Sequence, residues 1–245
     1  MPFIAILTIV FQVVLSIHVV RRGNSLYWIL IIILFPLIGG IVYLVVAVLP
    51  ELQNNQRYRK AGNKLKKTLA PNRDLKIYSD NLERADTIDN KISLANELLN
   101  KGMVKDAIAL YKESLNGIYR YEPILMLGLS KAYFENNEYQ KTKKTLDSLI
   151  EENPDFKSQE GHLLYARVLE MLGDLSGALE EYKVVSGYYS GYEAKCRYAL
   201  LLKYQGDATE ANLLFNEILN DSKFSSKHAN SLNSEWIKIA KDEVL

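Results

Sequence analysis

The sequence contains a single cysteine, Cys196, among its 245 residues. A lone thiol cannot form a disulfide within the chain, so nothing here implies an oxidising compartment. Cys196 falls on an apolar helical pattern and has no paired histidine or metal-ligand neighbour in the sequence. We therefore predict that it is a small residue of the core or of a groove, not a reactive nucleophile.

A marked excess of one sign of charge is also missing, since the formal net charge is only +1. The total conceals a division, because residues 1–85 hold 11 Lys and Arg against 4 Asp and Glu, whereas residues 86–245 hold 19 against 25. Nucleic-acid binding needs a concentrated basic face on a folded domain, and the acidic latter part does not supply one. The distribution instead predicts a membrane-proximal front segment joined to a soluble domain.

Charge is absent altogether from two stretches, 2–20 and 26–49. As helices they would extend about 28 and 36 Å, close to the roughly 30 Å hydrocarbon core of a bilayer. Only the short turn 21–25 separates them, so they would run antiparallel. A signal peptide is the alternative, but no basic side chain precedes the first stretch. We predict a two-helix transmembrane hairpin over residues 1–50.

Pro36, Gly39 and Gly40 lie in the middle of the second stretch. They predict a kink and a smooth face on which the first helix packs closely, although proline and glycine are common in membrane helices generally.

Arg21-Arg22, Trp28 and the segment 35–44 (Phe-Pro-Leu-Ile-Gly-Gly-Ile-Val-Tyr-Leu) carry a family resemblance. Residues 5–50 resemble the N-terminal hairpin of bacterial cardiolipin synthases and related phospholipase-D-type proteins. Those enzymes act through paired His-x-Lys-x4-Asp motifs, and none of the three histidines here begins one. The resemblance therefore implies a shared anchor without the phosphatidyl chemistry.

Basic residues gather just after the second stretch, in a predicted helical linker over residues 51–85. Because the side richer in Lys and Arg stays cytoplasmic, we predict a protein of the bacterial inner membrane with both termini in the cytoplasm. These cations would also lie against a bilayer containing anionic lipid. They are Arg57, Arg59, Lys60, Lys64, Lys66 and Lys67.

From residue 86 onwards the sequence repeats. Turn residues recur at Gly102, Asn137, Gly173 and Gly206, each followed five positions later by a small residue, Ala107, Thr142, Ala178 and Ala211. Small residues let paired helices pack closely, and Gly or Asn ends a helix in the left-handed conformation. Intervals of 35, 36 and 33 are near the ~34-residue period of tetratricopeptide repeats. Residues 86–221 thus resemble the tetratricopeptide repeat family, which implies an α-solenoid of about four helix pairs.

The remaining residues, 222–245, predict a capping helix with Leu232, Trp236, Ile237 and Ala240 on one face. Such a helix is expected because the last repeat otherwise exposes its apolar side to water. The predicted fold class is therefore all-α: hairpin, linker, solenoid and cap.

No pattern typical of catalysis is present. Residues 173–177 (Gly-Asp-Leu-Ser-Gly) follow a helix and lack the Lys-Ser/Thr that completes a phosphate loop. The glutamate pairs at 151–152 and 180–181 are adjacent rather than facing, and His162 has no partner in the pattern. We predict no enzyme activity, no cofactor and no metal site, and the sequence leaves the oligomeric state open.

Binding is the function that remains. In the tetratricopeptide repeat family the first helix of each pair lines a concave groove that receives a peptide or a helix, so the resemblance implies a protein or peptide partner. A polar, cationic ladder of Asn96, Lys131, Arg167 and Lys203 would suit an acidic segment. The predicted groove residues are Asn96, Asn100, Leu127, Lys131, Phe134, Arg167, Glu170, Lys203 and Tyr204, with Ile92, Leu99, Glu135, Leu163 and Cys196 beside them.

Three hypotheses follow from these patterns. The first is a membrane-anchored scaffold or adaptor that binds a partner at the bacterial inner membrane. The second is a non-catalytic accessory subunit of a phospholipid-metabolising or envelope-assembly complex, in which the hairpin itself is recognised. The third places the repeats outside the cytoplasm, as a periplasmic assembly factor.

Overall fold

The computed structural model describes residues 2–23, 25–36, 38–48 and 72–244. Every regular element within these ranges is a helix, which confirms the all-α prediction. The chain divides into two compact units, Met1–Arg73 and Asp74–Leu245. The predicted basic residues 57–67 lie outside the described ranges.

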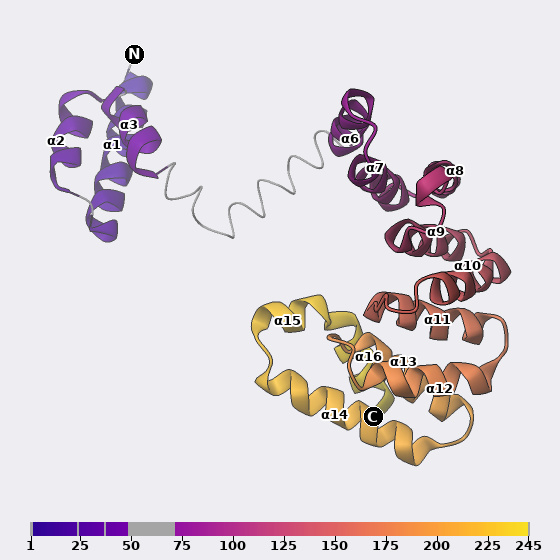
Figure 1. Cartoon of the computed structure of the whole chain (residues 1–245). Coiled ribbons are helices and arrows are strands. Elements are labelled where there is room, and N and C mark those ends of the chain that lie inside the picture. Colours follow the sequence, from indigo (N-terminus) through magenta and orange to yellow (C-terminus); the bar gives the residue numbers. More distant parts are fainter. Residues whose placement is uncertain (1, 24, 37, 49–71, 245) are drawn as a thin grey trace. The chain divides into compact units, whose positions relative to one another are not determined.

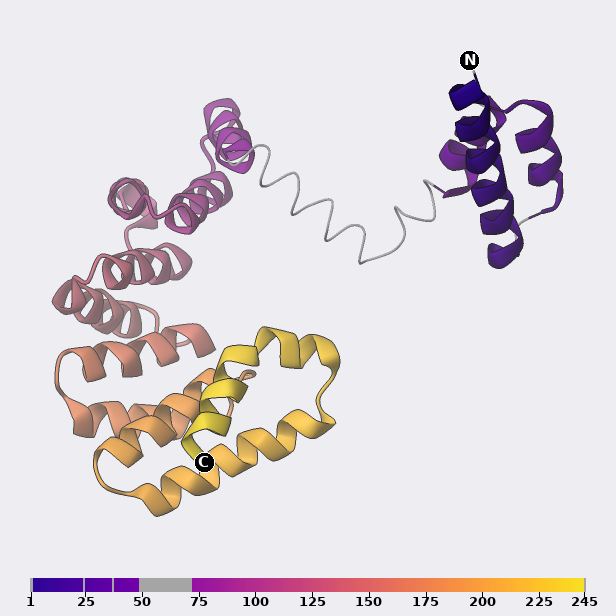
Figure 2. The same cartoon turned by 180° about the vertical axis from the view of Figure 1, so that it is seen from behind.

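The second unit is a row of stacked helix pairs (Figures 1 and 2). Helix α6 (Arg73–Arg84) precedes them, and a 3₁₀ turn, η2 (Gly117–Tyr119), separates the first two pairs. The pairs are α7 (Ile88–Asn100) with α8 (Val104–Ser114), α9 (Pro123–Glu135) with α10 (Tyr139–Glu152), α11 (Gln159–Met171) with α12 (Leu175–Ser186), and α13 (Glu193–Tyr204) with α14 (Ala208–Phe224).

The turn inside each pair has the predicted left-handed residue. The φ angles are +71° at Gly102, +59° at Asn137, +84° at Gly173 and +96° at Gly206. In each case the next N–H donates to the carbonyl five residues back, for example Met103 to Leu98 at 2.9 Å and Asp174 to Leu169 at 3.0 Å. This bond satisfies a carbonyl that the end of the first helix would leave unpaired, so the turn ends the helix sharply.

Polar side chains fix where several helices begin. Thr87, Ser158, Asp174 and Asp207 each accept a hydrogen bond from a backbone N–H three residues later. Such caps satisfy one of the four free donors at a helix N-terminus and contribute about 1 kcal/mol each.

The small residue of each second helix lies at a crossing with no room for a larger side chain. Ala107, Thr142, Ala178 and Ala211 are completely buried, as predicted. Four residues further on, a large side chain fills the space beside the crossing and is at most 2% exposed; these are Tyr111, Leu146, Tyr182 and Phe215. Full burial of such side chains contributes about 1.5–3 kcal/mol each.

The C-terminal end differs from the single predicted capping helix. Helix α14 continues to Phe224, and two short helices follow, α15 (Lys227–Leu232) and α16 (Ser234–Val244). Helix α16 packs against α14 and α13, where Trp236 and Ile237 cover the core of the last pairs. Leu232, predicted on the same face, is 72% exposed because it belongs to α15 instead.

The first unit contains α1 (Pro2–Arg22), α2 (Tyr27–Leu34), α3 (Ile38–Tyr43) and a π-helix, η1 (Leu44–Val48). None of the helices among the described residues combines the length and the apolar character that crossing a bilayer requires. The predicted transmembrane hairpin, and with it the location in the bacterial inner membrane, is therefore wrong.

Proline is the physical reason in the second stretch. Pro36 lacks an N–H and disfavours a helical conformation at Phe35, so the stretch breaks into helices of 8 and 6 residues. At 1.5 Å per residue these extend only about 12 and 9 Å. Helix α1 is longer, but it carries Gln12, Ser16 and His18 as well as two arginines.

Gln12 repairs the break that Pro36 makes. Since Pro36 cannot donate to the carbonyl of Ile32, the side-chain amide of Gln12 donates to it instead, at 2.8 Å, and to Ile33 at 3.3 Å. Gly40 lets α3 approach α1, because a Cβ there would lie 2.5 Å from Cε1 of Phe11. Gly39 lies against the backbone of Ile31 in α2.

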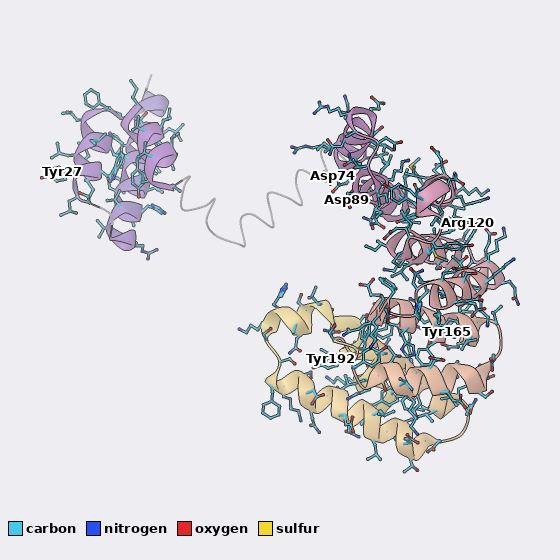
Figure 3. The ribbon with its side chains drawn as sticks, in the orientation of Figure 1. Tyr27, Asp74, Asp89, Arg120, Tyr165 and Tyr192 are labelled. Carbon is cyan, nitrogen blue, oxygen red and sulfur yellow. The ribbon has the colours of Figure 1, made fainter. Side chains whose placement is uncertain are left out.

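Apolar side chains cover much of the outside of this unit. Ile9, Leu30 and Ile41 are each more than half exposed, and Tyr27, labelled in Figure 3, is 78% exposed. His18, by contrast, contacts the buried Tyr43, whose hydroxyl lies 2.9 Å from its Nδ1. An apolar surface of this extent is typical of an interaction surface.

Cys196 is completely buried on α13, as predicted, and its sulfur faces the carbonyl of Trp236 at 3.9 Å. Burial raises the pKa of its thiol to about 12. The reactive thiolate is therefore scarce even at pH values well above neutral.

Replacing Gly128 with alanine should destabilise the second unit. An added Cβ would lie 2.5 Å from the Tyr111 ring, which is buried and held by a hydrogen bond to Asn96. Overpacking costs about 1–3 kcal/mol, against about 1 kcal/mol that alanine gains over glycine in a helix. We expect a net loss of about 1 kcal/mol in the free energy of unfolding, measured by urea denaturation. Gly187→Ala is the control, because its Cβ would have only a 3.4 Å contact; equal effects of both changes would contradict the packing.

Cys196 should resist alkylation in the folded chain. Because its pKa lies near 12, iodoacetamide should fail to modify it at about pH 8 and still at about pH 10, where an ordinary thiol is ionised. The same reagent should modify it fully in urea, as measured by mass spectrometry. Rapid modification of the folded chain would show that the α13–α16 contact opens.

Candidate functional site

A hollow of about 690 Å³ runs across the first helices of successive pairs. We call it the first-helix groove. Its residues come from α7, α9 and α11, from the connection that precedes α13 and from the start of α13: Asn96, Leu99, Asn100, Lys131, Phe134, Glu135, Glu160, Leu163, Leu164, Arg167, Tyr189 and Glu193. Five predicted site residues, Asn96, Asn100, Lys131, Phe134 and Arg167, therefore lie together.

Helical spacing explains why these side chains share one face. Asn96 and Asn100 are four residues apart on α7, as are Lys131 and Glu135 on α9, and residues at this spacing lie above one another on a helix. The amide of Asn96 is further fixed by the hydroxyl of Tyr111, which donates to its Oδ1 at 2.8 Å. Burial raises the pKa of Tyr111 to about 12, so this hydroxyl stays protonated and remains a donor.

Ion pairs join α9 to α11 and α11 to α13. Lys131 pairs with Glu160 of α11, and Arg167 lies 3.7 Å from Glu193 of α13. The guanidinium of Arg167 also stacks on the Phe134 ring, 4.6 Å from its centroid. A cation over an aromatic face contributes about 0.5–1 kcal/mol or more. Phe134 and Arg167 thereby tie the second and third pairs together along the groove.

These pairs change the predicted charge of the groove. Its two cations, Lys131 and Arg167, are accompanied by three carboxylates, those of Glu135, Glu160 and Glu193. The ladder expected to be cationic is thus neutralised from within. The sequence does contain one sign of these carboxylates. Glu160 lies seven positions before Arg167, two helical turns earlier on the same face.

Lys203 and Tyr204 do not lie in this hollow. Lys203 donates to a carboxylate oxygen of Glu243 in α16 at 2.8 Å, and Tyr204 is 78% exposed at the end of α13. The repeat interval of 33 places Leu200, not Lys203, opposite Arg167 in register. Lys203 therefore lies about one turn beyond the position that continues the ladder.

Leu127 and Glu170 support the fold rather than line the groove. Leu127 is only 9% exposed and belongs to the core between the second and third pairs. Glu170 accepts a hydrogen bond of 2.6 Å from the hydroxyl of Tyr182. Burial, together with this bond to Glu170, raises the pKa of Tyr182 well above its usual range.

No cluster of three or more metal-ligating side chains occurs in the part of the chain that the structure describes. The three histidines are also dispersed along the sequence. The prediction that the chain is not an enzyme stays a prediction.

Residues 125–155, which span the second helix pair, match the family model described as tetratricopeptide repeat. No curated protein matches the sequence. These comparisons therefore give no support to the resemblance between the N-terminal stretch and cardiolipin synthases.

Solved structures share the fold at low sequence identity. TTC0263, a thermophilic TPR protein of Thermus thermophilus, is 19% identical, with a TM-score of 0.54 over 76% of this chain and 98% of its own. MamA is 20% identical, with a TM-score of 0.52 over 64% and 93%. YrrB, a TPR protein with an unusual peptide-binding site, is 16% identical, with a TM-score of 0.50 over 68% and 91%. The chain therefore has the fold of tetratricopeptide repeat solenoids, which confirms that part of the predicted architecture.

Proposed function

We propose that this chain is a non-catalytic scaffold that binds a segment of a partner protein in the first-helix groove. The observation that carries the proposal is the row of groove side chains supplied by successive pairs of a repeat fold. Repeat folds of this kind create extended concave binding surfaces. The peptide-binding site named for YrrB supports the same class of function.

Contacts within the chain already hold the cationic side chains of the groove in place without a partner. Lys131 and Arg167 each hold the neighbouring first helix through a carboxylate, and Arg167 is also stacked on Phe134. Side chains that are already ordered lose less conformational entropy on binding, which raises affinity for a given contact area.

The chemistry of the groove favours a neutral or basic segment. Glu135 is exposed, and no Lys or Arg among the described residues forms an ion pair with it, whereas both groove cations are paired. A lysine or arginine of the partner would complement Glu135. The amides of Asn96 and Asn100 each have donors and acceptors that suit a peptide backbone.

The membrane part of the adaptor hypothesis is not retained, because no described helix qualifies as a span. The hypothesis of an accessory subunit in a larger complex gains no separate support, since its recognition element was the same hairpin.

Reversing the charge of Glu135 should weaken binding. Peptides selected from a random library on the full chain should bind Glu135→Lys at least about tenfold more weakly, which corresponds to about 1.4 kcal/mol. Fluorescence anisotropy with labelled peptides measures the affinity.

Glu113→Lys is the matched control, because Glu113 is also an exposed glutamate and lies on α8, a second helix outside the groove. It should leave the affinity unchanged. Selection of only acidic peptides, or equal losses in both variants, would refute a groove that binds neutral or basic segments.

A further inference from the structure

The last repeat helix and the cap meet at a corner of the chain. Helix α14 ends at Phe224, two serines follow, and the short helix α15 begins at Lys227. We call residues 222–234 the α14–α15 corner. It lies at the C-terminal end of the repeat unit (Figures 1 and 2), and none of its residues lines the first-helix groove.

Hydrogen bonds hold this corner in place. The side-chain amide of Asn230 donates to the carbonyl of Ser222 at 2.7 Å, which ties α15 to the last turns of α14. Tyr192, labelled in Figure 3, contacts the corner twice. Its hydroxyl lies 3.0 Å from that of Ser225, and its backbone N–H donates to Oδ1 of Asn233 at 3.0 Å. The corner is therefore ordered by contacts within the chain.

Two large apolar side chains project from the corner. Phe224 is 92% exposed, the largest exposed fraction of any large apolar side chain among the described residues, and Leu232 is 72% exposed. No residue of α15 belongs to the apolar core of the last pairs. Aromatic residues are enriched at the centres of protein interfaces, so Phe224 is a candidate anchor for a partner.

Basic side chains share the outer face of α15 with Leu232. Lys227 and His228 are exposed, as are Ser231 and Leu232 one turn later, whereas the two residues between them are partly buried. Residues four apart lie above one another on a helix, so Leu232 lies beside His228 on this face. The corner thus combines apolar and basic side chains on one exposed surface.

The corner contains no carboxylate of its own. Residues 222–234 include Lys223, Lys227 and His228 but no aspartate or glutamate, and Asp221 and Glu235 flank them in the sequence. Both lysines are exposed, and neither forms an ion pair in the part of the chain that the structure describes. Unlike the paired cations of the groove, these lysines can therefore bind carboxylates of another molecule.

The charge of the rest of the unit favours a protein segment over an anionic bilayer. Residues 86–245 hold 19 basic and 25 acidic residues, a net charge of −6. A bilayer would present its negative charge to a wide area of this acidic unit. A peptide segment would contact the corner alone, and salt screens charges beyond about 8–10 Å.

We propose that the α14–α15 corner docks an acidic segment of a partner protein that also carries apolar side chains. Its carboxylates pair with Lys223 and Lys227, and its apolar side chains cover Phe224 and Leu232. This docking surface is separate from the first-helix groove and prefers the opposite charge.

A fluorescently labelled peptide of alternating aspartate and leucine tests the proposal. Fluorescence anisotropy with the full chain measures its affinity. Lys227→Glu should weaken binding at least about tenfold, because it replaces an attraction by a repulsion between like charges. Phe224→Ser should weaken binding to a similar extent, because it removes the apolar anchor.

The chain offers a matched control for each change. Lys144→Glu reverses another exposed lysine, on α10, and Ile118→Ser removes an apolar side chain that is 89% exposed in η2. Both controls should leave the affinity unchanged. All four substitutions lie at exposed positions, so circular dichroism and the melting temperature should be preserved. Absence of peptide binding, or equal losses in the controls, would overturn the docking surface.

A peptide with lysine in place of aspartate separates the corner from the groove. Lys227→Glu should not weaken its binding, because its cations are repelled by the lysines of the corner. If Lys227→Glu weakened both peptides equally, the preference for an acidic segment would be wrong. Neither result bears on the groove, which Glu135→Lys tests.

Vesicles of phosphatidylcholine and phosphatidylglycerol test a lipid surface as the occupant. Any sedimentation of the full chain with these vesicles should be the same for the unsubstituted chain and for Lys227→Glu. A lower sedimented fraction of Lys227→Glu would assign the corner to a bilayer and overturn a protein partner.

Discussion

The close crossing inside each helix pair is the contact on which the rest of the repeat unit depends. Ala107, Thr142, Ala178 and Ala211 have no exposed surface, so these small side chains are enclosed within the stack. A large side chain four residues later then fills the gap next to the crossing. Because all four pairs use the same contact, every first helix lies on one side of the stack and every second helix on the other.

This arrangement creates the groove that we assign to a partner. The first helices bring together side chains from α7, α9 and α11 that lie far apart in the sequence. The groove does not exist in a single pair, since it requires the stacking of at least two. A substitution at a crossing would therefore affect the groove by changing the spacing of the pairs.

In the first unit, the side-chain amide of Gln12 replaces the hydrogen-bond donor that Pro36 lacks. Pro36 ends α2 and exposes the carbonyl of Ile32, and Gln12 from α1 satisfies it. The long helix α1 and the short helices α2 and α3 therefore meet around Leu15, Val19, Ile32 and Tyr43. Many aliphatic side chains are left on the outside of this unit, so its surface is far more apolar than that of the repeats.

What the sequence determined by itself was the repeat architecture. Turn residues, small residues and large residues recur at fixed intervals, and each acts within a few residues of the backbone, so the left-handed turns at Gly102, Asn137, Gly173 and Gly206 could be predicted. The faces of α7, α9 and α11 followed from the same periodicity. Length and absence of charge, by contrast, did not reveal that the second apolar stretch breaks at Pro36, because the outcome depends on Gln12 in another helix.

Only the tertiary structure decided which charges meet. Lys131 and Glu160 are 29 residues apart, and Lys203 and Glu243 are 40 apart. No local period relates such residues. The sequence therefore showed a row of cations but not the carboxylates that pair with them in the folded chain. Helix periodicity is set by the geometry of a single backbone, whereas ion pairs and hollows depend on the distances between separate helices, and folding alone fixes those distances.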